Sequence, residues 1–86
     1  MTVKLEYYTA KWCGPCRNMG PVIAELQAAG WDVTKIDVDE QPALASRNGV
    51  MAMPTFLFYK DGLVVKRITG ARSKAILENE LRILER

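Results

Sequence analysis

The order in which strand and helix patterns follow one another constrains the fold of this chain more than any other feature. Residues Val3 to Tyr8 alternate apolar and polar side chains, as a half-buried strand does. After a short turn, apolar residues from Met19 to Leu26 recur at helical spacing, and Gly30 follows where a helix end favours glycine. The chain therefore opens with a strand and then a helix that begins near Pro15, and we expect a kink at Gly20-Pro21.

A second strand, a short helix and a hairpin are expected next. Val33 to Val38 has the pattern of a strand, and Asp39 can cap a short helix that runs through Arg47. Two β-forming runs, Thr55 to Tyr59 and Leu63 to Ile68, flank a turn that contains Asp61-Gly62. Because Asp-Gly is a strong hairpin signal, these two strands should be antiparallel neighbours.

The chain should end in a helix. Ser73 can cap it, and Leu77, Leu81 and Leu84 repeat at the spacing of one helical face. The resulting order, β-α-β-α-β-β-α, predicts an α/β fold with a four-stranded mixed sheet and helices on both faces. No linker or repeat interrupts the pattern, so we expect residues 1–86 to form one domain.

Composition and charge argue against several classes of function. The twelve basic and ten acidic residues are scattered along the chain, without the basic cluster that nucleic-acid binding requires. The first residues, Met1 to Glu6, interrupt their apolar side chains with charges, which does not suit a signal peptide or a membrane span. We therefore expect a cytoplasmic monomer that binds neither nucleic acid nor membranes.

Cys13 and Cys16 are the only cysteines. A disulfide between them closes too short a loop to stabilise a fold usefully, so chemistry explains the pair better than architecture. The chain has no histidine, which excludes a Cys-His nucleophile pair, a His-containing zinc site and c-type haem attachment. A zinc site would have to be completed by carboxylates or by a second subunit, and we expect no metal.

The position of the two cysteines indicates thiol-disulfide exchange. Cys13 lies between the first strand and the helix, where free backbone N–H groups and the helix dipole stabilise a thiolate. Cys-X-X-Cys motifs lower the pKa of the first thiol from about 8.5 to roughly 3.5 to 7.5, which makes Cys13 the attacking sulfur. Cys16 lies one helical turn on, shares that face and can close a redox-active disulfide with Cys13. No bound cofactor is needed.

Neighbouring residues suit a surface that receives a partner protein. Gly14 allows close approach, and Pro15 fits the first helical turn because its missing N–H would have no partner there. Trp12 offers a flat apolar surface beside the sulfurs, and the segment Val50 to Pro54 supplies more. A disulfide-containing substrate protein could bind to this combined patch.

These residues resemble the thioredoxin family. The run Ala10 to Arg17, which contains Trp-Cys-Gly-Pro-Cys, looks like the active-site segment of thioredoxins, and Met53-Pro54-Thr55 resembles the family's cis-proline loop. Further matches are Met19, Pro21, Asp61, Gly62 and Gly70. The resemblance implies a minimal thioredoxin fold and a protein-disulfide reductase that serves electron transport and cell redox homeostasis.

The resemblance also assigns roles to residues outside the motif. It implies that Pro54 is cis and faces Cys13, that the backbone of Met53 pairs with an extended substrate, and that Gly70 borders the same groove. Lys35 matches the family's partly buried lysine near the dithiol, although a lysine in a strand is more often simply exposed.

Two departures from the family leave alternatives open. Only one strand precedes Cys13, which gives the chain the pared-down size of a glutaredoxin, so its electron donor is either a thioredoxin reductase or glutathione. Tyr7 stands where the family carries a buried aspartate beneath the second cysteine, which leaves Cys16 without the usual proton acceptor. A different class of function is a redox-independent binding subunit that uses the apolar patch around Trp12 and Met53.

Overall fold

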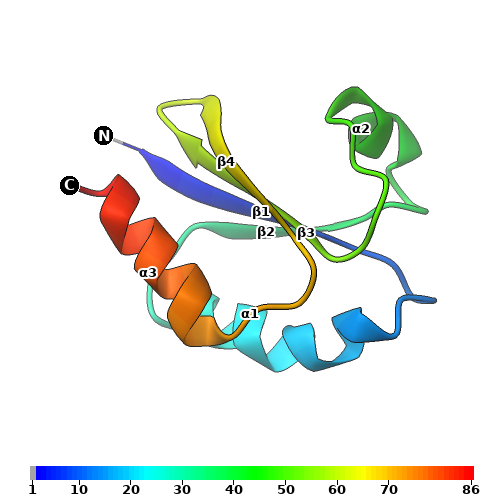
Figure 1. Cartoon of the computed structure of the whole chain (residues 1–86), viewed down its shortest axis with the longest axis horizontal. Coiled ribbons are helices and arrows are strands. Elements are labelled where there is room, and N and C mark those ends of the chain that lie inside the picture. The colour runs from blue at the N-terminus through cyan, green and yellow to red at the C-terminus, as the bar shows by residue number, and fades with distance from the viewer. Residues whose placement is uncertain (1) are drawn as a thin grey trace.

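The computed structural model describes residues 2–86 and contains a four-stranded sheet with helices on both faces (Figure 1). The strand order is β2-β1-β3-β4; β1 runs parallel to β2, and the other two pairs are antiparallel. The elements are β1 (Val3–Thr9), a 3-10 helix η1 (Pro15–Asn18), α1 (Met19–Ala28), β2 (Val33–Asp37), α2 (Pro42–Arg47), β3 (Thr55–Lys60), β4 (Leu63–Thr69) and α3 (Lys74–Leu84). The expected element order and the mixed sheet are confirmed.

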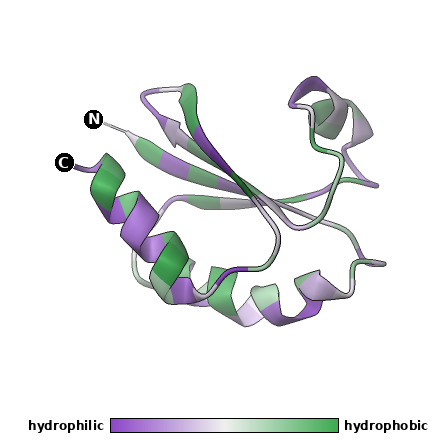
Figure 2. Ribbon diagram, viewed as in Figure 1, coloured by the Kyte–Doolittle hydropathy of each residue, from purple (hydrophilic) through white to green (hydrophobic). Residues whose placement is uncertain are grey.

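Each face of the sheet carries its own apolar core. Helices α1 and α3 lie together against one face, and the short α2 lies on the other (Figure 1). Hydrophobic residues recur along the strands and on one side of α3 (Figure 2). The α1/α3 core consists of Leu5, Tyr7, Met19, Ile23, Leu26, Val33, Phe56, Phe58, Leu77 and Leu81. The α2 core consists of Tyr8, Ala10, Cys13, Cys16, Ile36, Val38, Ala45, Val50 and Leu57.

The β3–β4 hairpin and the last helix form as the sequence predicts. Asp61 and Gly62 both have positive φ, 52° and 85°, the combination that a tight two-residue hairpin turn requires. The Ser73 hydroxyl accepts a hydrogen bond of 3.3 Å from the backbone N–H of Ile76, which caps α3. Between Thr2 and Arg86 no helix has the length and apolar character needed to cross a membrane.

The helix after the first strand differs from expectation at its start. The sequence predicts one helix from Pro15 with a kink at Gly20-Pro21, whereas the structure has η1 from Pro15 to Asn18 followed by α1 from Met19. The change of helix type therefore comes before Gly20. Pro21 is the third residue of α1, within the first turn, where backbone N–H groups lack an intrahelical acceptor and a proline is tolerated.

The predicted cap of the second helix is wrong. Asp39 does not cap it; α2 begins at Pro42, and Gln41 precedes it without a side-chain cap. Proline is preorganised for the first helical position, which places the start there. The Asp37 carboxylate accepts hydrogen bonds from the backbone N–H groups of Asp39 and Glu40, so Asp37 stabilises the loop that precedes α2.

Candidate functional site

A disulfide joins Cys13, which lies between β1 and η1, to Cys16, the second residue of η1, and their Cα atoms are 5.3 Å apart. The backbone N–H of Cys16 lies 3.2 Å from the Cys13 sulfur and points to it. Because Pro15 has no N–H, the amide of Cys16 is the first donor that this helical turn offers. A thiolate on Cys13 would accept that hydrogen bond in the reduced protein, which favours its charged form.

Tyr7 lies beneath the disulfide. Its ring is buried and stacks on Phe56 with the ring centroids 5.5 Å apart, and its hydroxyl lies 3.5 Å from the backbone oxygen of Cys16. The side chain points inward, as expected. The expectation of a half-buried first strand is nevertheless wrong, because helices cover both faces of the sheet and Leu5 to Thr9 are all buried.

Lys35 pairs with Tyr7 in the β1–β2 register and lines the same pocket as both cysteines. It is exposed, so the partial burial that the resemblance implies is wrong, because β2 is an edge strand of the sheet.

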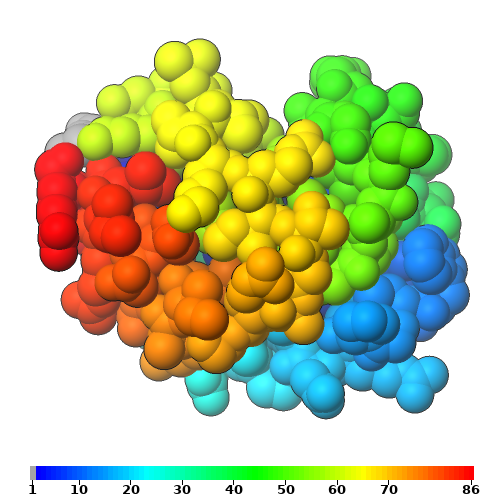
Figure 3. Space-filling model, viewed as in Figure 1, coloured from blue at the N-terminus to red at the C-terminus, as the bar shows by residue number. Residues whose placement is uncertain are grey.

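Trp12, Met51 and the half-buried Met53 present apolar surface beside the sulfurs, whereas Val50 and Pro54, expected to add to it, are buried because they pack into the molecule. Trp12 is 68% exposed and Met51 is 93% exposed. The Met53–Pro54 peptide bond is cis, as the resemblance implies. The backbone N–H of Gly70, which has a φ of 100°, donates to the Pro54 oxygen at 2.8 Å. In the space-filling view the blue segment around the cysteines adjoins the green segment before β3 (Figure 3).

Sequence reasoning missed the partner of Trp12. The Trp12 indole N–H donates to the Asp39 carboxylate at 2.8 Å, which holds the ring over the β2–α2 loop. The two residues are 27 positions apart, and no local pattern signals the contact. Lys11 and Arg17 were missed as well, although both line the pocket that contains the two cysteines.

No group of three or more histidine, cysteine or acidic side chains within residues 2–86 is arranged to hold a metal ion.

Comparisons with known proteins agree with this geometry. A family model described as thioredoxin matches residues 2–82. The chain is 44% identical to a thioredoxin of Mycobacterium bovis, over 86% of its own length and 66% of that protein's length. It is 39% identical to a thioredoxin of Staphylococcus aureus, over 98% of its own length and 81% of the other.

Solved structures of similar proteins have the same fold. A mutant thioredoxin from Halobacterium salinarum matches with a TM-score of 0.92 and 36% identity, over 98% of this chain and 75% of the other. A thioredoxin from Nicotiana alata matches with a TM-score of 0.88 and 43% identity, over 95% of this chain and 72% of the other. The chain thus spans about two thirds to four fifths of the length of these relatives.

Proposed function

The chain belongs to the thioredoxin family of thiol-disulfide oxidoreductases, and from this premise we propose that it reduces protein disulfides through Cys13 and Cys16. The observation that carries the proposal is the Cys13–Cys16 disulfide at the junction of β1 and η1, with a backbone N–H directed at the Cys13 sulfur. Residues 1–86 act as one thioredoxin-like domain with no bound cofactor.

The reaction begins with the reduced dithiol. The Cys13 thiolate attacks one sulfur of a substrate disulfide and forms a mixed disulfide, while the other substrate sulfur leaves as a thiolate. Cys16 then loses its proton and attacks the Cys13 sulfur, which forms the intramolecular disulfide and releases the second substrate thiolate. Two electrons pass from the dithiol to the substrate.

Substrate proteins bind on the exposed surface beside Cys13. Trp12 supplies an apolar platform, and Gly14 and Pro15 shape the turn that carries the sulfurs. Met53, Pro54 and Gly70 form the groove that aligns an extended substrate segment. The hydrogen bond from Gly70 to Pro54 supports this assignment, because it holds the two sides of the groove together.

Tyr7 and Lys35 adjust proton transfer at the dithiol. Tyr7 lies beneath Cys16, and Lys35 lines the pocket that contains both cysteines; both positions support this role. Because Tyr7 is not an acid, Cys16 transfers its proton to water, beside Lys35 in the same pocket.

The reduced state is restored by a thioredoxin reductase in the cytoplasm, where the chain acts as a monomer. The oxidised protein is incubated with a thioredoxin reductase and NADPH, and separately with reduced glutathione. The rate at which each reduces the Cys13–Cys16 disulfide identifies the electron donor. Faster reduction by the reductase is the expected result. Faster reduction by glutathione would instead make the chain glutaredoxin-like.

Two cysteine variants test the proposed reaction. Cys13→Ser should abolish reduction of a disulfide-bonded protein such as insulin, because the attacking sulfur is lost. Cys16→Ser should still attack and should accumulate a mixed disulfide, which mass spectrometry detects. A mixed disulfide that forms through Cys16 in the Cys13→Ser protein, and not through Cys13, would reverse the two roles.

A further inference from the structure

Arg67 holds the start of the loop that leads to the substrate groove. This loop comprises residues 48–54, between the end of α2 and the start of β3. The Arg67 guanidinium donates to the backbone oxygen of Gly49 at 3.2 Å and also to the backbone oxygen of Asn48. Carbonyl groups at the C-terminal end of a helix lack intrahelical donors and carry partial negative charge. Arg67 therefore caps α2 from a different element, and its contacts fix where the loop begins.

The sheet register explains why Arg67 reaches the loop. Arg67 pairs with Leu57 of β3, which belongs to the α2 core, so the Arg67 side chain leaves β4 on the α2 face. Just after β4, the backbone N–H of Gly70 donates to the Pro54 oxygen at 2.8 Å. One short stretch of backbone thus holds the 48–54 loop at both of its ends.

A buried carboxylate provides a second attachment for the start of the loop. The Asn48 side-chain amide donates to the Tyr8 hydroxyl at 2.8 Å, and this hydroxyl donates to the Glu6 carboxylate at 2.9 Å. Tyr59 donates to the same carboxylate oxygen at 2.7 Å. Because a buried carboxylate is costly without donors, the two tyrosines stay in place and Asn48 keeps a fixed acceptor.

The middle of the loop is only partly packed against the protein. Val50 is buried, and its backbone N–H donates to the Ala45 oxygen at 2.9 Å, whereas Met51 is 93% exposed. An exposed segment gains little from packing, so its conformation depends on how its ends are held. A loop held in its bound conformation also loses less entropy when a substrate binds.

We propose that Arg67 is a positioning residue for protein substrates, because it keeps the 48–54 loop in the conformation that receives them. Met53 and Pro54, at the end of this loop, are the groove residues that depend on it. The hydrogen bonds that end at Glu6 support the same conformation from inside the α2 core. The inference rests on the proposed function of the substrate groove and adds the residues that keep the groove formed in the free protein.

Loss of Arg67 should lower the affinity for a protein substrate and leave the dithiol chemistry unchanged. In Arg67→Met the loop loses two hydrogen bonds, so the receptive conformation is populated less and the apparent affinity falls by the same factor. We expect the insulin concentration that gives the half-maximal rate to rise by about two- to fivefold, the range of an exposed hydrogen bond. The maximal rate should not change.

Two measurements separate substrate binding from dithiol chemistry. Fully reduced protein is mixed with an excess of insulin at a series of concentrations, and the fraction of oxidised protein is measured after rapid quenching. These single-turnover rates give the half-maximal concentration and the maximal rate separately. The rate at which iodoacetamide alkylates the reduced protein measures the reactivity of the Cys13 thiolate without the groove, and it should be the same in Arg67→Met and the wild type.

Arg47→Met is the matched control for Arg67→Met. Arg47 is exposed in the last turn of α2, and among residues 2–86 it takes part in no ion pair. Both variants lose the same side chain and the same charge, but Arg47→Met keeps the contacts to the loop, so its half-maximal insulin concentration should match the wild type. Arg67→Lys keeps the charge but not the guanidinium fork, so it should restore part of the affinity.

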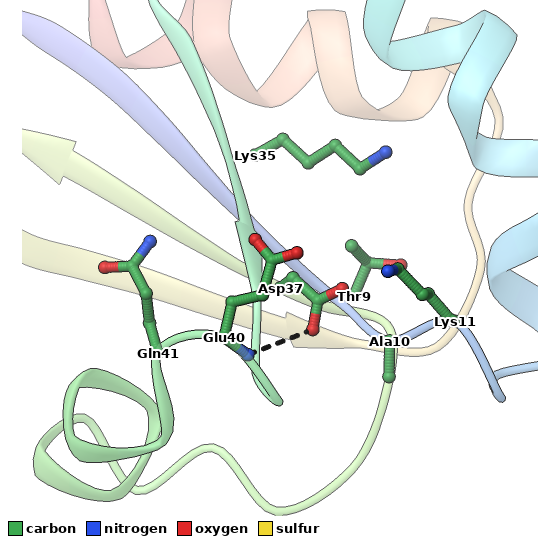
Figure 4. Close-up of a pocket in the computed structure, with 7 residues that line it drawn as sticks. All are labelled: Thr9, Ala10, Lys11, Lys35, Asp37, Glu40 and Gln41. Atoms are coloured by element: carbon green, nitrogen blue, oxygen red, sulfur yellow. Dashed lines mark hydrogen bonds between the residues drawn. The ribbon is translucent and has the colours of Figure 1, made fainter.

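Glu6→Gln tests the inner attachment, and Glu40→Gln is its control. Figure 4 shows Glu40 in a pocket at the ends of β1 and β2, and no residue of the 48–54 loop lines that pocket. Glu6→Gln should raise the half-maximal insulin concentration by about twofold, because the amide still accepts a weaker hydrogen bond from Tyr8. Glu40→Gln should have no effect.

Hydrogen exchange measures the loop itself. The backbone N–H of Val50 lies in the loop, whereas that of Leu5 lies in β1 and donates to the Asp32 oxygen at 2.9 Å. In Arg67→Met the Val50 amide should exchange about two- to fivefold faster, and the Leu5 amide should exchange at the wild-type rate. Equal acceleration of both amides would show that Arg67 stabilises the whole fold and not this loop, and would overturn the proposal.

An unchanged half-maximal insulin concentration in both Arg67 variants would overturn the proposal as well. The same holds if Arg47→Met raises it as much as Arg67→Met, since charge and not contact would then matter, or if the maximal rate and the alkylation rate fall together. If Arg67→Met is unfolded in urea melts, Arg67→Lys carries the comparison, with an expected rise of about twofold. Failure of the wild type to reduce insulin would instead contradict the proposed function, and Val50 exchange would still show whether Arg67 holds the loop.

Discussion

Tyr7 and Tyr8 are neighbours in β1, yet their rings enter two different cores. Tyr7 lies in the α1/α3 core, stacks on Phe56 and makes only a long contact, of 3.5 Å, from its hydroxyl to the Cys16 oxygen. Tyr8 lies in the α2 core, and its hydroxyl donates to Glu6 at 2.9 Å and accepts from Asn48 at 2.8 Å.

The other polar contacts of the α1/α3 face are part-buried, from Trp31 to Glu78 and from Gln27 to the Val33 oxygen. On the α2 face a hydrogen bond of the Tyr8 hydroxyl is fully buried, so this face depends more on polar contacts inside its core.

The polar contacts on the α2 face form a connected cluster. Glu6 is 8% exposed, and its carboxylate also accepts the Tyr59 hydroxyl at 2.7 Å. The Arg67 guanidinium donates to the backbone oxygens of Asn48 and Gly49, at the end of α2. The cluster therefore connects β1, β3 and β4 to the loop that continues toward Pro54.

The difference between the faces follows from the length of their helices. Helices α1 and α3 have 10 and 11 residues and bury several apolar side chains, whereas α2 has 6 residues and buries only Ala45. A helix as short as α2 gains little stability from packing. Side-chain hydrogen bonds at its C-terminal end therefore help to hold α2 against the sheet. Within the described part of the chain every buried side-chain nitrogen and oxygen has a partner, so hydrogen bonds offset the desolvation cost of these groups.

Tyr7→Asp should have the largest effect, because it brings a charge into the apolar face. The change removes a buried ring and buries a carboxylate, so we expect a loss of about 3 to 5 kcal/mol in the free energy of unfolding. It should also raise the pKa of the Cys13 thiol, because a carboxylate opposes a second negative charge nearby. Denaturant melts and ultraviolet thiolate absorbance against pH measure the two effects, with the pKa repeated in a Cys16→Ser background because coupled thiols titrate as a pair. A Cys13 pKa that stays constant or falls would mean that position 7 does not act on the dithiol.

Glu6→Gln should weaken the α2 face while leaving its shape in place. The amide still accepts hydrogen bonds from Tyr8 and Tyr59, but bonds to a charged acceptor are stronger, so the cost should be about 1 to 2 kcal/mol. The pKa of Tyr8, which burial and then the Glu6 hydrogen bond raise to about 12, should fall toward 10. Tyrosinate absorbance against pH measures the Tyr8 pKa. An unchanged value in Glu6→Gln would show that burial alone raises the pKa of Tyr8.

The wild-type protein should lose stability above pH 10. Tyr8 has a pKa of about 12 in the folded state, above its ordinary value of 10, and burial raises the pKa of Tyr59 as well. Between pH 10 and about pH 12 the unfolded chain releases tyrosine protons that the folded chain retains. The free energy of unfolding therefore falls as the pH rises from 10 to about 12. Denaturant melts at a series of pH values measure the slope. In Tyr8→Phe the slope should be shallower, and an identical slope would exclude a contribution from Tyr8.

Removal of the two hydroxyls should show the smallest and most direct contrast between the faces. Tyr8→Phe leaves the Asn48 amide without its acceptor and should cost about 1 kcal/mol. Tyr7→Phe removes only the 3.5 Å contact and keeps the ring stack, so it should cost no more than about 0.5 kcal/mol. Denaturant melts of both variants and of the wild type measure the two losses in the free energy of unfolding. Equal losses would mean that the faces do not differ in their dependence on polar contacts.

The sequence by itself determined the features that depend on neighbouring residues. Strand alternation, helical spacing and the Asp61-Gly62 turn act over a few residues, so they predict the element order and the inward direction of Tyr7. The spacing of Cys13 and Cys16 likewise predicts their disulfide, because three residues make about one helical turn. The family resemblance, and not the local pattern, indicated the cis bond before Pro54.

Tertiary structure decided the contacts between residues that are distant in the sequence. Trp12 meets Asp39 across 27 positions, and Tyr59 meets Glu6 across 53. Lys35 comes beside the cysteines only because β2 lies parallel to β1 in one register. Strand register and helix packing arise from burial summed over the whole chain, and a polar side chain whose partner lies in another element carries no local signal of that partner.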